Sequence, residues 1–545
     1  MAALRLFHGT RLIGKLWCLR ALLFVLECCA KASLAWRGNG LPRWARSKFH
    51  NVADAISSQE KQRHSPPLMT GIKMLKRIPQ YLLRPAIVIS AIYLVALLVL
   101  LPYVDSLGQD INYDLMNYHL FSADNLIHGA GFRNIVNEQQ FLAPYVYLPF
   151  YVLETVFGPR MGALILAAMQ LLNLALVPVL AYAVLDSVDE SPWIKALLAA
   201  SCTLVAASSP MFLTEIGTSF ADILTTIPAI GGLILWCLAM RSGAPRWQNM
   251  IAGMLLGIAA GLKLTAAIYP FAVVVSAMVS GPRKTRVDNC IRLVVGSAVG
   301  FSLVAGWWTY RLYDNFDSPL FPFFNNVLKS KFYPASPFVD ARFIPKSFSE
   351  ALTYPLQWLV GLNPSSELPF RDARFVVIFT GTTFLLASLF WRKLRSIGTP
   401  DNDYRKAFDQ ARFAPLLVFF IVCFVTWLKL FSIQRYIVGL ELIAGVILMG
   451  LVLQTVRAIW PSAIILVVLS IGIAAWAKPS DFGHSAWAKT IATVQMPPAL
   501  KDRDALYLLA GLPMAYIVPE FSRGSQFVDI GMHNDASNAM GVKLA

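Results

Sequence analysis

Charged residues are scarce in this chain of 545 residues: only 14% are Asp, Glu, Lys or Arg, while 57% are hydrophobic. A soluble globular domain carries roughly 25% charged residues, so the composition excludes an ordinary soluble enzyme and a disordered chain. The mean hydropathy is +0.57, and long apolar stretches recur from residue 85 to about residue 477. The sequence therefore predicts an all-α polytopic membrane protein.

Cysteines and nucleotide-binding motifs are also sparse. The seven cysteines lie in the first 30 residues or in or next to apolar stretches, so neither a disulfide framework nor a cysteine metal site is indicated. The sequence has no Walker A motif and no Rossmann fingerprint, which argues against a nucleotide-driven pump.

Positive charge is concentrated at the N-terminus. Residues 1–85 contain 15 Lys or Arg and 3 acids, which gives +12 of the formal net charge of +16. In a membrane protein such a block favours retention on the cytoplasmic side over nucleic-acid binding, and we expect no nucleic-acid partner. Segment 1–84 is therefore interpreted as a cytoplasmic tail, an organellar targeting segment, or an over-extended reading frame whose true start is Met69 or Met74.

Apolar windows of about 20 residues predict about eleven transmembrane helices. Their expected positions are 85–104, 160–185, 196–213, 223–240, 250–264, 266–280, 291–309, 374–391, 413–431, 436–454 and 460–477. If the first helix runs outward, the Lys/Arg clusters fall in inside loops, which predicts a cytoplasmic N-terminus and an extracytoplasmic C-terminus.

Two long outer loops and a tail follow from this topology. Loop one is expected at 105–159, loop two at 310–373 and the tail at 478–545. The apolar segment 141–157 contains two prolines and a glutamate, and we interpret it as lying in or dipping into the outer interface, because a crossing would move the basic loops outside. The stretch LYLLAGLPMAYIVPEFSRGSQFVDI predicts strand, turn and strand, and hence a small α/β tail.

The first polar cluster is GQDINYDLMNYHLFSADNL in loop one. Asp110, Asp114 and Tyr118 are spaced four apart and would share one helical face, whereas His119 points partly elsewhere. A solvated amphipathic juxtamembrane helix is the structural alternative.

Three further clusters face the same predicted side. Glu215 and Asp222 are seven apart, which predicts one helical face, and both are expected to flank a turn that faces outside; a helix-capping or interface acid is the alternative. Lys263 stands alone between two apolar runs, where a snorkelling lysine is the alternative. Gln434, Arg435 and Tyr436 form a very short outer turn. The guanidinium of Arg435 suits phosphate oxygens, and a lipid-headgroup contact is the alternative.

Acids beside cations at a membrane surface favour chemistry on a lipid-linked phosphosugar. A carboxylate can deprotonate an acceptor hydroxyl, and Lys or Arg can stabilise a departing phosphate. An ion-coupled transporter could use such groups too, but it more often has internal repeats and sites at the bilayer midplane.

Several motifs resemble those of the GT-C superfamily of integral-membrane glycosyltransferases. DLMNYHL at 114–120 resembles the D-x-x-[NS]-Y-H motif of bacterial members, and GLKLTAAIYP resembles their G-x-x-K segment. SPLFPFFNNVLKS at 318–330 resembles a loop motif of the same proteins, and QRYIVGLE resembles their R-Y-[LI]-x-x-L-E run. The resemblance covers roughly residues 85–477, and the shared order of the motifs carries more weight than any one of them.

The resemblance implies an inverting hexosyl- or pentosyltransferase that uses a polyprenyl-phosphate sugar at the outer face of the cell inner membrane. By resemblance, Asp114 is the catalytic carboxylate, and Asp110 could support it or bind a divalent cation, which some members use. Asp222 matches the second-loop acid, with Glu215 as its competitor. The donor phosphate is implied to contact Lys263 and the turn at Gln434, Arg435 and Tyr436, and His119 and Tyr118 are supporting residues. Loop one lacks the acidic pair of many members, which leaves the base and the metal open.

A short tail favours a lipid or glycan acceptor over a folded protein. Two alternatives remain at this point: a transporter or flippase for a polyprenyl-linked glycan, and a polymerase-type protein of surface polysaccharide assembly.

Overall fold

The computed structural model describes residues 84–129, 131–186, 190–241, 243–281, 283–336, 339–395, 410–456, 458–501 and 503–530. The predictions for segment 1–84 fall outside these ranges except at Arg84, and so does the end of the tail after residue 530.

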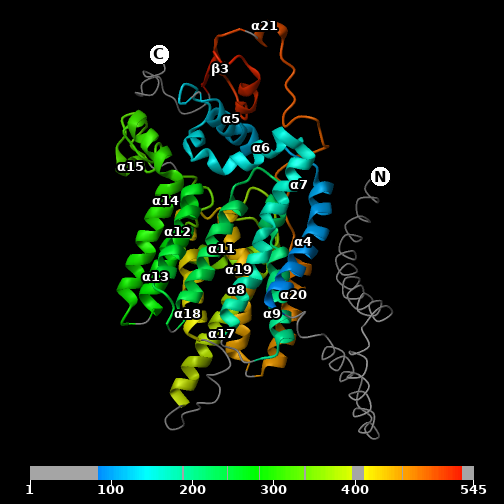
Figure 1. Cartoon of the computed structure of the whole chain (residues 1–545), viewed down its shortest axis with the longest axis vertical. Coiled ribbons are helices and arrows are strands. Elements are labelled where there is room, and N and C mark those ends of the chain that lie inside the picture. The colour runs from blue at the N-terminus through cyan, green and yellow to red at the C-terminus, as the bar shows by residue number, and fades with distance from the viewer. Residues whose placement is uncertain are drawn as a thin grey trace, which may run out of the picture. The chain divides into compact units, whose positions relative to one another are not determined.

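The described chain is mostly helical (Figure 1). Its long apolar helices are α4 (Pro85–Leu107), α7 (Pro159–Gln170) with α8 (Leu172–Leu185), α9 (Pro192–Ala207), α11 (Asp222–Ala239), α12 (Trp247–Leu262), α13 (Ile268–Ser280), α14 (Arg286–Phe316), α17 (Arg374–Arg395), α18 (Gln410–Leu430), α19 (Val438–Thr455) and α20 (Ile459–Trp476). Among the described residues, eight spans are long and apolar enough to cross a membrane, and three shorter apolar helices accompany them. The predicted class, a polytopic helical membrane protein, is confirmed. Each predicted span overlaps one of these helices, and the number of spans stays a prediction.

Shorter elements connect the long helices. They are β1 (Gln109–Asp110), η2 (Leu115–His119), α5 (Leu120–His128), η3 (Glu138–Phe141), η4 (Pro144–Tyr147), α6 (Leu148–Phe157), α10 (Pro210–Glu215), η5 (Leu264–Ala267), α15 (Asn325–Leu328), α16 (Phe348–Val360), η6 (Gln434–Ile437), β2 (His484–Ser485), α21 (Pro498–Lys501), β3 (Leu506–Leu509), η7 (Ala515–Glu520) and β4 (Gln526–Asp529).

Helix α19 is the centre of the bundle. Every residue from Val438 to Val452 is buried, and the helix packs against α8, α9, α11, α17, α18 and α20. A helix that is apolar on all sides is stable only when other helices or lipid surround it. Its first turn, η6, therefore projects from a rigid central element.

Helices α12 and α14 approach closely because glycines line their contact. A Cβ at Gly257 would lie 2.0 Å from the carbonyl oxygen of Ser297, and a Cβ at Gly300 would lie 2.0 Å from that of Met254. Small residues at four-residue spacing let membrane helices pack backbone against backbone. This packing fixes the end of α12, and with it Lys263.

Segment 141–157 does not form a long span. It folds into the end of η3, then η4 and the ten-residue helix α6. In Figure 1, α5, α6 and α15 lie together at one end of the bundle. We call this end, which also carries the ordered tail, the loop end.

The tail contains a small sheet that also includes loop one. Strands β3 and β4 pair in parallel, and Ile135 forms a parallel bridge with Val528 of β4. The two expected strands are present, but they are parallel rather than antiparallel. Parallel neighbours cannot be joined by a tight hairpin and need a longer crossover, and η7 lies in that connection.

Candidate active site

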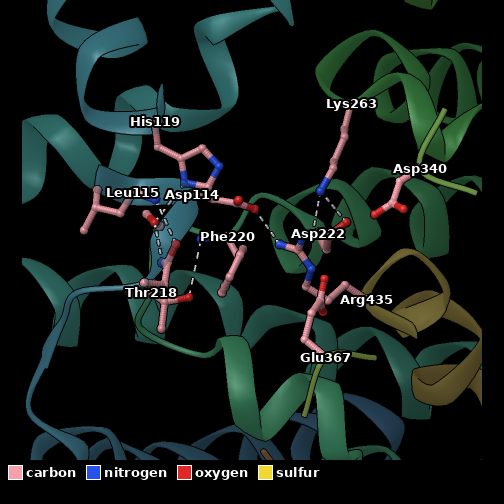
Figure 2. A network of polar contacts seen from close by, with 12 residues as sticks. Asp114, Leu115, His119, Thr218, Phe220, Asp222, Lys263, Asp340, Glu367 and Arg435 are labelled. Atoms are coloured by element: carbon pink, nitrogen blue, oxygen red, sulfur yellow. Dashed lines mark hydrogen bonds and ion pairs between the residues drawn. The ribbon is translucent and has the colours of Figure 1, made fainter. Parts of the chain in front are cut away.

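Four segments from distant parts of the sequence meet at the loop end of the bundle. They are the turn after β1, the turn between α10 and α11, the break between α12 and α13, and η6 at the start of α19. Figure 2 shows their polar side chains converging, with the carboxylate of Asp114 and the guanidinium of Arg435 pointing toward each other.

Asp114 and Arg435 form a nearly buried ion pair. Nη1 of Arg435 donates to Oδ2 of Asp114 at 2.8 Å, and each side chain is 14% exposed. Burial alone would raise the pKa of Asp114, but the charge of Arg435 and its hydrogen bond, together with Lys263, outweigh burial and hold this pKa below its ordinary value. Asp114 is therefore ionised in the resting site.

Lys263 and Asp222 form a second pair beside the first. Nζ of Lys263 lies 2.7 Å from both carboxylate oxygens of Asp222, and the side chains are 11% and 4% exposed. The same Nζ lies 4.8 Å from the centroid of the Tyr436 ring. Two cations of different helices thus stand side by side, each neutralised by one carboxylate.

Aromatic rings surround Arg435. Its guanidinium carbon lies 4.5 Å from the centroid of Phe220, 5.7 Å from that of Phe482 and 5.8 Å from that of Tyr436. Its Nε has no hydrogen-bond partner among the described residues. Rings over the faces of a guanidinium leave its edge free for planar oxygen ligands.

His119 supports the site as a neutral side chain. Its Nδ1 lies 2.9 Å from Oγ of Ser219, and its ring stacks on Tyr147 at 4.2 Å, with Tyr118 edge-on at 4.4 Å. Burial lowers the pKa of His119 to about 3. The motif residues Tyr118 and His119 lie in the π-helical turn η2, a wide turn that often occurs at functional sites.

Asp110 does not share a helical face with Asp114, so that expectation is wrong. Asp110 lies in β1, which pairs with β2 of the tail, and the helix begins only after Asn112. Its carboxylate turns inward and accepts from the side chain of Asn112 and from the backbone N–H of Asn112 and of Ser219. Burial raises the pKa of Asp110, and these hydrogen bonds partly oppose the increase. Asp110 thus holds loop one against the 215–222 turn.

Glu215 and Asp222 flank a turn, as predicted, but they lie on different helices, contrary to the prediction of one face. Glu215 ends α10 and Asp222 begins α11, because a turn separates them. Glu215 is fully buried, and its carboxyl oxygens have no hydrogen-bond partner within the described part of the chain. Burial, with the charge of Asp222, raises the pKa of Glu215 well above its ordinary value. Of the two acids, Asp222 is the one that holds a cation.

Gln434 faces away from the two ion pairs. Its side chain donates to Glu441 and accepts from the hydroxyl of Ser365 at 3.2 Å, and Ser209 donates to Glu441 at 2.5 Å. This network anchors η6, so Gln434 orients the turn that carries Arg435.

Loop two supplies charged residues that sequence reasoning missed. Asp340 and Glu367 lie at the edge of the network in Figure 2. Arg342 bridges them, at 2.6 Å from Asp340 and 3.4 Å from Glu367. Phe220 and Phe482 were also missed, since an apolar side chain in a loop carries no sequence signal for a site. The Asp-x-Asn pattern at Asp110 could have indicated the inward turn.

The divalent cation considered for Asp110 stays a prediction. Both oxygens of Asp110 already accept hydrogen bonds, and across the described ranges no three His, Cys, Asp or Glu side chains converge as a metal site. Lys263 and Arg435 place two positive charges at the site.

Comparison with protein families gives one match. Residues 143–332 match the model of glycosyltransferase family 87. No curated protein matches the chain, and no solved structure does. The match covers about a third of the chain, supports a glycosyltransferase and is consistent with the resemblance to membrane glycosyltransferases of the GT-C kind. It includes Glu215, Asp222 and Lys263 but not Asp114 or Arg435, whose roles rest on the geometry.

Proposed function

We propose that this protein transfers a sugar from a polyprenyl-phosphate-linked donor to a lipid or glycan acceptor at the outer face of the cell inner membrane. The observation that carries the proposal is the adjacent placement of two buried ion pairs, Asp114 with Arg435 and Asp222 with Lys263, at the loop end of a membrane bundle. The pairs supply a carboxylate for the acceptor and two cations for a phosphate.

An apolar pocket next to Lys263 supports a lipid-linked donor. The lining of the pocket is almost wholly apolar, and Lys263 is the one charged residue among those that line it. Its walls come from the end of α12, the middle of α14 and residues 319–323, and they include Leu262, Phe301, Ala305, Trp308, Leu312 and Phe321. A hydrocarbon chain in this pocket would place an attached phosphate at Lys263.

Donor binding would rearrange the two ion pairs. A phosphate that reaches Lys263 and Arg435 competes with Asp222 and Asp114 for the same N–H groups, since guanidinium and ammonium groups bind phosphate strongly. Asp114 would then lose its cation and become a stronger base in a site with little water. The resting pairs thus keep the cations charged and in place until substrate arrives.

The transfer step follows from this arrangement. The acceptor hydroxyl oxygen attacks the anomeric carbon, and its proton passes to Asp114 as the new carbon–oxygen bond forms. The bond between the anomeric carbon and the phosphate oxygen breaks, and polyprenyl phosphate leaves with its added negative charge stabilised by Lys263 and Arg435. One direct displacement of this kind inverts the anomeric configuration.

The proposal that the site faces away from the cytoplasm rests on the distribution of positive charge. Loop one, loop two and the ordered tail lie at the loop end, whereas the sequence places the Lys/Arg clusters in the opposite loops. By the positive-inside rule the loop end faces away from the cytoplasm.

The test uses the full chain in lipid nanodiscs with a panel of polyprenyl-phosphate sugars, each with a short-chain lipid or glycan acceptor. Release of free polyprenyl phosphate together with a glycosylated acceptor of inverted configuration is the expected result. Asp314 is exposed on α14, and its substitution Asp314→Asn serves as the matched control that should retain wild-type rate. Binding of donors without any turnover, combined with their movement across a vesicle membrane, would overturn the proposal in favour of a flippase.

A further inference from the structure

The first part of the tail crosses the candidate site and is held at several points. We call residues 478–491 the tail strap. The backbone of Lys478 forms an antiparallel β-bridge with that of Arg371 in loop two. The backbone N–H of Ser480 donates to Oγ1 of Thr214 at 3.1 Å. The strap is therefore fixed to loop two and to α10 before it reaches loop one.

Loop one holds the other end of the strap. Strand β2 of the strap pairs antiparallel with β1, with Gln109 opposite Ser485 and Asp110 opposite His484. The side chain of Gln109 donates to the carbonyls of Thr490 and Ile491 at 2.9 and 2.8 Å.

The backbones of the strap and loop one are in close contact at Gly108. This residue has φ of +95°, and a Cβ here would lie 2.1 Å from the carbonyl oxygen of Ser485. Only glycine fits both the conformation and the space.

Phe482 projects from the strap into the site. Its ring packs against Phe220 at 5.5 Å between centroids, and the guanidinium of Arg435 lies 5.7 Å from it and 4.5 Å from Phe220. The two rings come from segments about 260 residues apart in the sequence, yet both lie near one cation.

Aromatic rings next to a guanidinium attract it electrostatically and exclude water from its faces. They also restrict its rotation, so that its edge stays directed toward Asp114 or toward an oxygen ligand that replaces it. Each of these effects strengthens the binding of a phosphate at that edge, because a desolvated cation interacts more strongly than a hydrated one.

We propose that Phe482 is a positioning residue for Arg435 and that the tail strap is thereby an integral part of the donor-phosphate site. The inference rests on the proposed function, since it assigns Arg435 to a phosphate. It adds that affinity for polyprenyl phosphate depends on a ring delivered by the tail.

The experiment measures binding of undecaprenyl phosphate to the full chain in nanodiscs, with the thermal unfolding midpoint recorded for each variant. For Phe482→Ala the dissociation constant is expected to rise about tenfold, the size of effect typical of a partly desolvated cation–π contact. Phe482→Trp should bind undecaprenyl phosphate as the wild type does, because it keeps an aromatic ring. Phe482→Leu, which keeps an apolar side chain but has no ring, should bind as weakly as Phe482→Ala. Lys489→Ala, an exposed position in the same strap, is the control and should bind as wild type does.

Two outcomes would overturn the inference. One is wild-type affinity in a folded Phe482→Ala variant, and the other is full rescue by Phe482→Leu, which would assign Phe482 a packing role only. Arg435→Ala separates this failure from failure of the proposed function. If Arg435→Ala binds weakly while Phe482→Ala binds normally, only the strap inference fails, and if Arg435→Ala binds normally, the phosphate assignment and the inference fail together.

A second variant tests the strap without changing any side chain that contacts Arg435. Gly108→Ala should displace the strap backbone and raise the dissociation constant in the same direction as Phe482→Ala. Combining Gly108→Ala with Phe482→Ala should add little, because the ring is already withdrawn. Fully additive losses would contradict a shared mechanism.

Discussion

The guanidinium of Arg435 lies 2.8 Å from the carboxylate of Asp114, although 321 residues separate the two in the sequence. The contact joins loop one to the first turn of the central helix α19. Because each partner is nearly buried, removing either one leaves an uncompensated charge in a dry site. A ligand that brings its own negative charge can replace Asp114 at Arg435 without that penalty, and this exchange is the basis of the proposed donor binding.

The first prediction concerns pH. Arg435 and Lys263 hold the pKa of Asp114 below its ordinary value in the donor-free site. Asp114 therefore stays ionised in the free enzyme, and kcat/KM for the donor should stay level as the pH falls to the ordinary range of an aspartate and drop only below it. Without the guanidinium, burial dominates and the pKa of Asp114 rises. The acid limb of the pH profile of kcat/KM, which reports the free enzyme, should therefore lie at higher pH for Arg435→Gln than for the wild type. An acid limb at the same pH in both proteins would show that ionisation of Asp114 does not control the reaction.

The second prediction concerns the Lys263–Asp222 pair. Lys263→Met should destabilise the protein by about 3–5 kcal/mol, because it leaves a buried carboxylate unpaired. The double variant Lys263→Met with Asp222→Asn should recover most of that stability but not the affinity for donor. Thermal unfolding and donor binding, measured on the two single variants and the double variant, test this difference. Recovery of donor binding in the double variant would show that Lys263 serves only to neutralise Asp222.

The residues of the two ion pairs could be predicted from the sequence, but the way in which they are paired could not. Lys263 and Arg435 could be identified because a lone cation in an apolar run is costly, and Asp114 because it opens a motif. Neither the strand pairing that withdraws Asp110 nor the position of Phe482 could be predicted. The pairing joins Asp110 to a tail residue about 370 positions later, and Phe482 contacts Phe220 about 260 positions earlier. Gln434 was placed correctly in its turn, but the buried network that turns it toward Glu441 is a tertiary feature.

The helices were easier to predict than the loops for the same reason. Each span is specified by its own apolar run, whereas loop one is specified by what it packs against. Glu215 and Asp222 show the limit of spacing arguments. The turn between them was predicted, but their seven-residue spacing wrongly suggested one helical face, because the turn places them on two helices.

The third prediction concerns Glu154 on α6, whose carboxyl oxygens are buried without a hydrogen-bond partner among the described residues. Burial, aided by the charge of Asp110, raises the pKa of Glu154 from 4.5 to about 9. A carboxyl whose pKa is raised on folding contributes full stability below pH 4.5, and this contribution is lost as the pH rises toward 9. Glu154→Gln should therefore have little effect at pH 4.5 and stabilise the protein by roughly 2–4 kcal/mol at pH 8. Equal thermal midpoint differences at the two pH values would contradict this account.

The fourth prediction concerns metal removal. Because Lys263 and Arg435 are proposed to carry the charge of the leaving phosphate, treatment with EDTA should leave the transfer rate of the wild type within about twofold. The measurement is an initial rate with and without added Mg²⁺ after chelation. A loss of activity that Mg²⁺ restores would instead indicate a metal bound together with the substrate.

The most direct test of the central claim is single-turnover sugar transfer by wild type, Asp114→Asn and the control Asp314→Asn, with the donor that the wild type accepts. Asparagine keeps the shape of Asp114 but cannot accept the hydroxyl proton. The account predicts that Asp114→Asn folds and binds donor, yet transfers sugar at least about 100-fold more slowly, while Asp314→Asn transfers at the wild-type rate. Transfer by Asp114→Asn at the wild-type rate would contradict the account and remove Asp114 from the chemistry.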